Sequence, residues 1–141
     1  MMSDFTWRGV TADEVHDGWW DRVAPLILRA ALRGGGEMTA IDILKAIGER
    51  RMQLWVVLEG ETVIGVVVTE IQDYPSKRLA LVSILAGDRL DEWMYLLEEV
   101  LEPWAKAQNA KDIVCDCRPG LEGILKARGW HTKQVRMRKS L

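Results

Sequence analysis

Three apolar runs and the segment that follows them constrain the fold of this chain more than any other feature. The runs are Leu54–Leu58, Thr62–Ile71 and Leu79–Leu85. The turn Ala86–Asp88 ends the third run, and an amphipathic segment from Arg89 to about Lys106 begins directly after it. This order predicts a three-strand meander that leads into a long helix. Turns of this kind, between a central strand and a helix, are where mixed α/β domains usually hold anions and cofactors.

The segments around the meander predict further helices and strands. Thr11 opens a capping-box pattern with Glu14, and Thr39 is a second expected helix cap. Gly18 should weaken the first helix and Pro25 should bend or divide it, before the glycine run 34–36 ends it. The expected elements are strands over 5–10, 53–58, 62–70, 78–85, 112–117 and 131–139, and helices over 11–33, 39–49, 89–106 and 121–128. Gly65 should mark either a bulge or a close approach of another backbone.

This element order, β-α-α-β-β-β-α-β-α-β, predicts an α+β (mixed α/β) fold in which helices cover a central mixed sheet. The chain has 141 residues, which fits a single domain over 1–141. Its last expected strand, 131–139, alternates charged and apolar residues and should lie near an edge of the sheet.

Composition excludes several classes of function. A formal net charge of −2 disfavours a general nucleic-acid binder. No apolar run is long enough to span a membrane, and the start of the chain lacks a signal pattern, so we expect a cytoplasmic protein without membrane partners. The two cysteines, Cys115 and Cys117, should be reduced thiols on one face of a strand. With only His16 and His131 besides, no metal site is expected.

The order and two local phrases resemble the GNAT acyltransferase fold. The phrase Val63–Val68 is similar to the family's third strand, and Leu125–Trp130 is similar to its final corner, where a helix ends at a glycine followed by an aromatic residue. The resemblance covers nearly the whole chain as topology and very little of it as residue motif. It implies a single GNAT-like domain and, for an active member, acetyl-CoA as the acyl donor.

The chain is also similar to small GNAT-like proteins of tailed bacteriophages and prophages. The phrases that carry this resemblance are Gln53–Val56, Val68–Ile71 and Glu102–Lys106. It implies a catalytically silent protein that binds no cofactor and acts through contacts with other protein chains. Its partners would be virion proteins or copies of itself, in the cytoplasm of a bacterial host or within an assembled virion.

The family's loop for the donor pyrophosphate, (Arg/Gln)-x-x-Gly-x-(Gly/Ala), would fall on residues 88–93. Asp91 and Trp93 stand at its glycine positions, and Asp88 stands at its leading basic position. These carboxylates should repel a diphosphate, which argues against ordinary acyl-CoA binding. If acetyl-CoA binds, Gly87 and Arg89 are the remaining cofactor-binding candidates.

For catalysis the resemblance implies a carboxylate base at the end of the third strand, and Glu70 matches that position. The alternative for Glu70 is a solvated strand end. The family's tyrosine general acid would fall on Leu125, which cannot donate a proton. Cys115 would need a histidine partner to act as a nucleophile, and neither histidine is near it in the sequence.

Seven tryptophans against one phenylalanine indicate an aromatic core with one or two side chains left for contacts. Trp19 and Trp20 are adjacent and cannot both face the core of one helix, so they are interface candidates. Arg136 and Arg138 lie in a basic tail without acids and are interface candidates too, the alternative being a solvated edge strand.

Two hypotheses follow, a silent GNAT-like contact protein and an acetyl-CoA-dependent N-acetyltransferase with a divergent loop. A contact protein should expose tryptophan and form an oligomer or a large contact surface. An enzyme should separate its fourth and fifth strands around an open cleft between 83–85 and 112–114.

Overall fold

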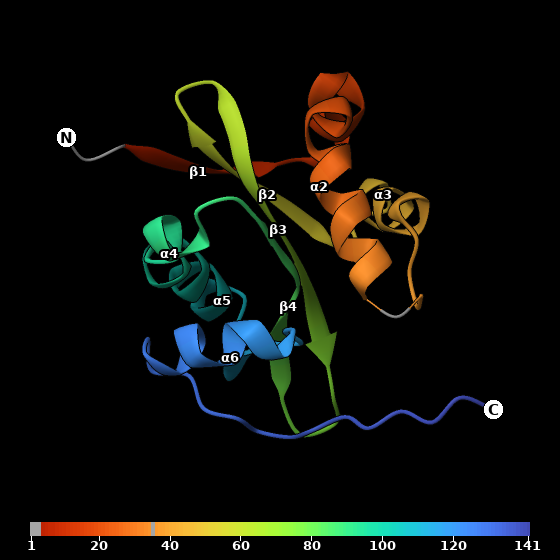
Figure 1. Cartoon of the computed structure of the whole chain (residues 1–141), viewed down its shortest axis with the longest axis vertical. Coiled ribbons are helices and arrows are strands. Elements are labelled where there is room, and N and C mark those ends of the chain that lie inside the picture. Colours follow the sequence, from red (N-terminus) through yellow and green to blue (C-terminus); the bar gives the residue numbers. More distant parts are fainter. Residues whose placement is uncertain (1–3, 35) are drawn as a thin grey trace.

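A computed structural model describes residues 4–34 and 36–141 of the chain. A mixed sheet crosses the molecule in the order β1-β2-β3-β4-β5 (Figure 1). Neighbouring strands are antiparallel except β4 and β5, which are parallel. The strands are β1 (Phe5–Val10), β2 (Gln53–Glu59), β3 (Thr62–Asp73), β4 (Arg78–Gly87) and β5 (Asp112–Cys115). The structure therefore confirms the expected α+β fold and the central meander.

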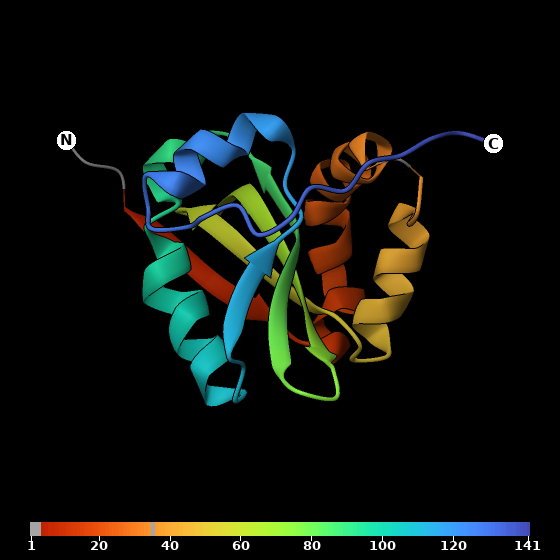
Figure 2. The same ribbon diagram turned by 90° about the horizontal axis from the view of Figure 1, so that it is seen from below.

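Helices cover both faces of this sheet (Figures 1 and 2). The helices α2 and α3 pack on one face, and α4, α5 and α6 pack on the other. The helical segments are α1 (Ala12–Glu14), η1 (Val15–Trp19), α2 (Trp20–Arg33), α3 (Ala40–Gly48), α4 (Leu90–Trp93), η2 (Leu97–Leu101), α5 (Glu102–Ala107) and α6 (Pro119–Lys126). The segment η2 is a wide, π-helical turn, and η1 is a kink between α1 and α2 with non-helical backbone angles at Asp17 and Gly18. Within the described ranges, no helix is long and apolar enough to cross a membrane.

The two predicted caps form, and they fix where the first helices begin. The Thr11 hydroxyl accepts the N–H of Glu14 at 3.1 Å, and the Glu14 carboxylate accepts the N–H of Thr11 at 3.1 Å. Thr39 and Asp42 make the same reciprocal pair. The first helix kinks at Asp17 and Gly18 and not at Pro25, which lies inside the continuous α2. Gly18 adopts a positive φ of 92°, which interrupts the helix where the chain has no Cβ to oppose it. Of the glycine run expected to end α2, Gly35 lies outside the described residues.

The segment after β4 is not the single helix predicted over 89–106. It begins with the single turn α4, widens into η2, and continues as α5. Pro103 lies in the first turn of α5, a position that proline commonly takes in helices. The apolar face expected for this segment is nevertheless the buried one, since Trp93, Leu97 and Leu101 are fully buried.

Two glycines permit close contacts, Gly65 between β3 and the helix layer and Gly87 between β4 and β3. A Cβ on Gly65 would lie 2.5 Å from the Trp93 ring. One on Gly87, whose φ is 143°, would lie 2.3 Å from the Ile64 carbonyl oxygen. Of the two alternatives predicted for Gly65, the bulge is confirmed, because the register between β2 and β3 shifts by one residue at Ile64, beside it. The close approach at Gly65 is that of the Trp93 side chain and not of another backbone.

The predicted last strand is wrong. Residues 131–141 have no regular secondary structure and are exposed along their whole length. They form an extended segment that leaves α6 and passes across the molecule (Figure 2). Alternating apolar and charged residues are compatible with an edge strand. A strand also needs a neighbouring strand to hydrogen-bond with, and the alternation alone does not show that one is available.

Candidate functional site

The strands β4 and β5 separate in the middle of the sheet. Their parallel pairing covers Leu79–Val82 against Asp112–Cys115 and then ends. β4 continues to Gly87, still paired with β3, while β5 gives way to a loop that leads into α6. The cleft predicted between 83–85 and 112–114 is wrong in its bounds, because 112–114 are paired with Leu79–Leu81. Pairing ends after Val82, and the stretch Ser83–Gly87 has no β5 partner among the described residues. We call this unpaired stretch of the β4 edge the gap.

A β-bulge at Ser83 marks the point of separation. Val82 lies opposite Thr69 and Ile84 lies opposite Val68, so Ser83 is an extra residue on β4. The bulge reverses the facing of the strand, which is why Val82 belongs to the α4–α6 core and Ile84 to the α2–α3 core. The Ser83 hydroxyl is buried and has no hydrogen-bond partner among the described residues. An unpaired strand edge and an unpaired hydroxyl therefore meet where β5 leaves the sheet.

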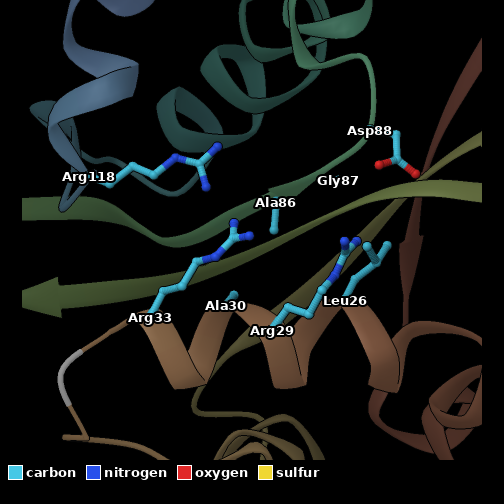
Figure 3. A pocket seen from close by; sticks show the side chains of 8 residues that line it. All are labelled: Leu26, Arg29, Ala30, Arg33, Ala86, Gly87, Asp88 and Arg118. Carbon is cyan, nitrogen blue, oxygen red and sulfur yellow. The ribbon is translucent and has the colours of Figure 1, made fainter.

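A cavity of about 240 Å³ opens at the carboxyl end of β4, on the α2 side of the sheet. Three arginines and one aspartate provide its charged lining: Arg29 and Arg33 from α2, Arg118 before α6, and Asp88 after β4. Figure 3 shows the three guanidinium groups reaching over β4 from two sides. Small residues, Ala30, Ala86 and Gly87, leave the space open between them.

The corner between β4 and α4 does not fit a diphosphate. Arg89, a cofactor-binding candidate from the sequence, is held by Glu92 at 2.7 Å and Glu59 at 2.9 Å and does not line the cavity. These hydrogen bonds raise the pKa of the Arg89 guanidinium above its ordinary value. The carboxylates of Asp88 and Asp91 add negative charge at the same corner. Gly87 lines the cavity, but its positive φ brings its backbone against that of β3.

The Trp93 side chain closes this corner from inside. Its indole N–H donates to the Asp88 carbonyl oxygen at 2.8 Å, and its ring lies against Gly65. Trp93 stands where the resemblance places a glycine, and it is fully buried. Trp93 therefore packs inside the corner, and a ligand cannot approach the backbone there as it could at a glycine.

Glu70 lies on β3 directly opposite Leu81, near the point where the strands separate. It is half-buried and makes no hydrogen bond or salt bridge with any described residue. Strand alternation places its side chain on the α2–α3 face, since Val68 belongs to that core and Thr69 faces the other layer with Trp55. Glu70 thus shares with the cavity the α2–α3 side of the sheet.

Several solved structures with the same architecture are named as acetyltransferases. An aminoglycoside acetyltransferase from an uncultured soil metagenomic sample, in complex with sisomicin, matches with a TM-score of 0.67 at 13% identity, over 97% of this chain and 96% of that chain. Glucosamine-6-phosphate N-acetyltransferase from Arabidopsis thaliana matches with a TM-score of 0.67 at 14% identity, over 97% and 98%. A predicted acetyltransferase with acetyl-CoA from Clostridium acetobutylicum matches with a TM-score of 0.71 at 12% identity, over 97% and 96%. The chain has the GNAT acetyltransferase fold. No protein-family model and no curated protein matches its sequence.

The GNAT fold places two further candidates where they cannot act in catalysis. Leu125, at the position of the family's tyrosine, is buried in the α4–α6 core. Cys115 is a free thiol whose burial raises its pKa to about 12, so it stays protonated and unreactive near neutral pH. The described residues contain no group of His, Cys, Asp and Glu able to hold a metal ion.

Most of the tryptophans serve the core of the GNAT domain. Trp7, Trp55, Trp93 and Trp104 form a continuous aromatic cluster with ring centroids 5.4–6.4 Å apart. The interface candidates Trp19 and Trp20 are both half-buried. The guanidinium groups of Arg8 and Arg22 lie over the Trp19 ring, at 4.8 and 4.3 Å from its centroid. Trp20 borders a shallow apolar hollow between α2 and α3, where Leu28 and Ile41 are exposed. The candidates Arg136 and Arg138 lie exposed in the C-terminal segment.

The sequence did not reveal the three arginines of the cavity. Arg29 and Arg33 are four residues apart on α2 and so share a helix face, a spacing that was visible in advance. Arg118 joins them only because the fold brings the start of α6 to the end of β4.

Proposed function

We propose that the chain is an acyl-CoA-dependent N-acyltransferase. The observation that carries this proposal is the bulge at Ser83 together with the end of β4–β5 pairing after Val82. Beyond these residues the β4 edge has no strand partner in the described chain, so its peptide groups are available to the amide groups of the donor's pantetheine arm. The matched acetyltransferase structures support the same use of the fold.

The reaction is acyl transfer from a thioester to an amine. The amine nitrogen attacks the thioester carbonyl carbon, the C–S bond breaks, and the CoA sulfur leaves and takes up a proton. Glu70 is the proposed base, which removes the proton that the amine loses. The Ser83 hydroxyl, which is buried and unpaired at the bulge, is proposed to hydrogen-bond the acyl donor there.

The acceptor class is proposed from the neighbours. Their names specify an aminoglycoside acetyltransferase and a glucosamine-6-phosphate N-acetyltransferase, both of which act on amino sugars. We propose a small polar amine as acceptor here, and amino sugars and polyamines are the first compounds to test.

The test combines calorimetric titration of acetyl-CoA with an assay of thiol release in the presence of amines. Wild type should bind acetyl-CoA and release CoA. Glu70→Gln should bind the donor equally well and lower kcat by about 10²–10⁴-fold, the usual effect of losing a general base. Glu61→Gln, in the exposed turn between β2 and β3, is the matched control and should leave both unchanged. Absence of both donor binding and thiol release would refute the proposal.

A second candidate is a catalytically silent contact protein, including a virion component. Two observations favour it: the acidic corner at Asp88 and Asp91, and the buried Leu125 in place of a proton donor. The hollow beside Trp20 would then be its contact surface, because Leu28 and Ile41 are 50% and 67% exposed there. A negative result in both arms of the acyltransferase test would favour this candidate.

A further inference from the structure

The charged lining of the cavity at the end of β4 is unusual for this chain. The protein as a whole carries a net charge of −2, yet three guanidinium groups and a single carboxylate surround this one space. Arg29 and Arg33 repel each other as like charges one helical turn apart, and Arg118 adds a third positive charge from another element. Such a cluster is most favourable when an anion lies within it.

These guanidinium groups are not used inside the fold. None of the three makes a hydrogen bond or salt bridge with another residue in the described ranges, and all three are exposed to solvent. Arg78, Arg89 and Arg128 contrast with them, since each donates to a carboxylate at 3.0 Å or less. The donors of Arg29, Arg33 and Arg118 are therefore available to a ligand.

The size and chemistry of the space define the ligand group. A cavity of about 240 Å³ lies below the ~300–1,000 Å³ of sites that enclose a whole small molecule, so it fits one end of a ligand or a small anion. Planar guanidinium groups pair with phosphate and carboxylate oxygens through two parallel hydrogen bonds, and three of them match a group with several oxygens better than a single carboxylate.

We infer that Arg29, Arg33 and Arg118 form a binding site for a phosphate-type oxyanion. Asp88 limits the site at the Gly87 end, where its carboxylate lies apart from the guanidinium groups (Figure 3). The site lies at the carboxyl end of β4 and replaces the acidic β4–α4 corner as the place of positive charge. Binding of the oxyanion itself does not depend on the proposed function.

The oxyanion has two possible sources, the phosphates of the acyl donor or a phosphate on a separate small ligand. Assignment to either one rests on the proposed function. The pocket lies on the α2 face, the same side of the sheet as Glu70, which any acceptor must reach. Two measurements distinguish a separate ligand from the donor. One is competition between pyrophosphate and coenzyme A, and the other is the binding of a truncated donor, pantetheine.

Calorimetric titration with inorganic pyrophosphate is the first test, on the full chain at low salt. Wild type should bind it, and rising salt should weaken binding. Each of Arg29→Ala, Arg33→Ala and Arg118→Ala should raise the Kd about tenfold or more, since each removes charge-assisted hydrogen bonds. Alanine suits the α2 positions as a strong helix former, and the Arg118 side chain makes no cap hydrogen bond, so the variants should fold. Asp88→Asn should tighten binding by removing the opposing charge.

Lys45→Ala is the matched control, because it removes one exposed positive charge from the neighbouring helix α3 without touching the cavity. It should leave the Kd unchanged. If wild type binds no pyrophosphate, or if the three arginine variants bind as wild type does, the inference is overturned. If Asp88→Asn alone alters binding, the inference is overturned as well.

Coenzyme A and pantetheine separate the two sources. If the donor phosphates occupy the site, coenzyme A competes with pyrophosphate, and the arginine variants weaken coenzyme A binding but not pantetheine binding. If a separate ligand occupies it, pyrophosphate and coenzyme A bind together and the variants leave coenzyme A binding intact. Both results support the oxyanion site. Failure of acetyl-CoA to bind at all, with pyrophosphate bound, would refute only the proposed function.

Discussion

At the scale of single residues, the contact between Gly65 and Trp93 determines how closely the helix layer approaches the sheet. The indole ring occupies the place where a side chain on Gly65 would lie, because a Cβ there would be 2.5 Å from the ring. The same ring supports the corner after β4 through its hydrogen bond to Asp88. This one pair therefore couples the centre of β3 to the turn that precedes α4.

Gly65→Ala should destabilise the protein by about 1–3 kcal/mol, because the added methyl group forces the buried indole or the strand to move. Urea unfolding followed by tryptophan fluorescence measures the change. Gly123→Ala is the control, since nothing lies within 4 Å of its Cβ position in α6. There the loss of backbone freedom in the unfolded chain should stabilise by about 0.5–1 kcal/mol. Equal stability of Gly65→Ala and wild type would show that the contact is loose.

At the scale of elements, the capping boxes at the helix starts make the stability of the fold depend on pH. Thr39 donates its backbone N–H to the Asp42 carboxylate at 2.9 Å, which lowers the pKa of Asp42 below its ordinary value of 3.8. A carboxyl group whose pKa is lower in the folded than in the unfolded state stabilises the fold above its unfolded pKa. That contribution is lost as the pH falls through the folded value.

Asp42→Asn should therefore flatten the acid side of the stability profile. Between pH 6 and pH ~3, the unfolding midpoint in urea should fall less steeply for this variant than for wild type. Asp17→Asn is the control, because the Asp17 carboxylate is exposed and makes no hydrogen bond with a described residue. Parallel profiles for Asp42→Asn and wild type would mean that the box does not hold the carboxylate ionised in solution.

Local sequence patterns correctly predicted the elements that depend mainly on residues close in the sequence. The caps at Thr11 and Thr39 and the meander strands needed only neighbours in the sequence, and the structure confirms them. The kink lies at Gly18, whose positive φ of 92° is outside the helical range, and not at Pro25, which the continuous α2 accommodates past its first turn. The single helix predicted over 89–106 failed because amphipathic spacing does not distinguish one straight helix from several turns that bury the same face.

The candidate site depended on contacts that no local pattern encodes. The resemblance indicated Glu70 and the separation of β4 from β5, both of which belong to the sheet. The arginine cavity joins α2 with the start of α6, which lie far apart in the sequence. Arg89 was chosen for its place beside the expected loop, but whether a cation is used internally depends on carboxylates such as Glu59 that only the fold brings to it.

At the scale of the whole molecule, the sheet ends at β5, and its outer edge has no strand partner in the described chain. The strand predicted over 131–139 near an edge of the sheet does not form, and the segment 131–141 lies exposed, with Val135 and Met137 at 77% and 88% exposure. The last buried residues of the core are therefore Leu121 and Leu125 in α6, and Trp130 packs against them directly after this helix.

A chain that ends at Trp130 should keep the fold. Because residues 131–141 are exposed, their removal should change the free energy of unfolding by no more than about 0.5 kcal/mol and leave acetyl-CoA and pyrophosphate binding unchanged. Leu125→Ala is the contrasting variant, and it should cost about 2–5 kcal/mol because it empties a buried position. Urea unfolding and light scattering check both variants. A large loss of stability in the shortened chain, or a change from dimer to monomer, would show that the segment pairs with a strand edge, its own or that of a second copy.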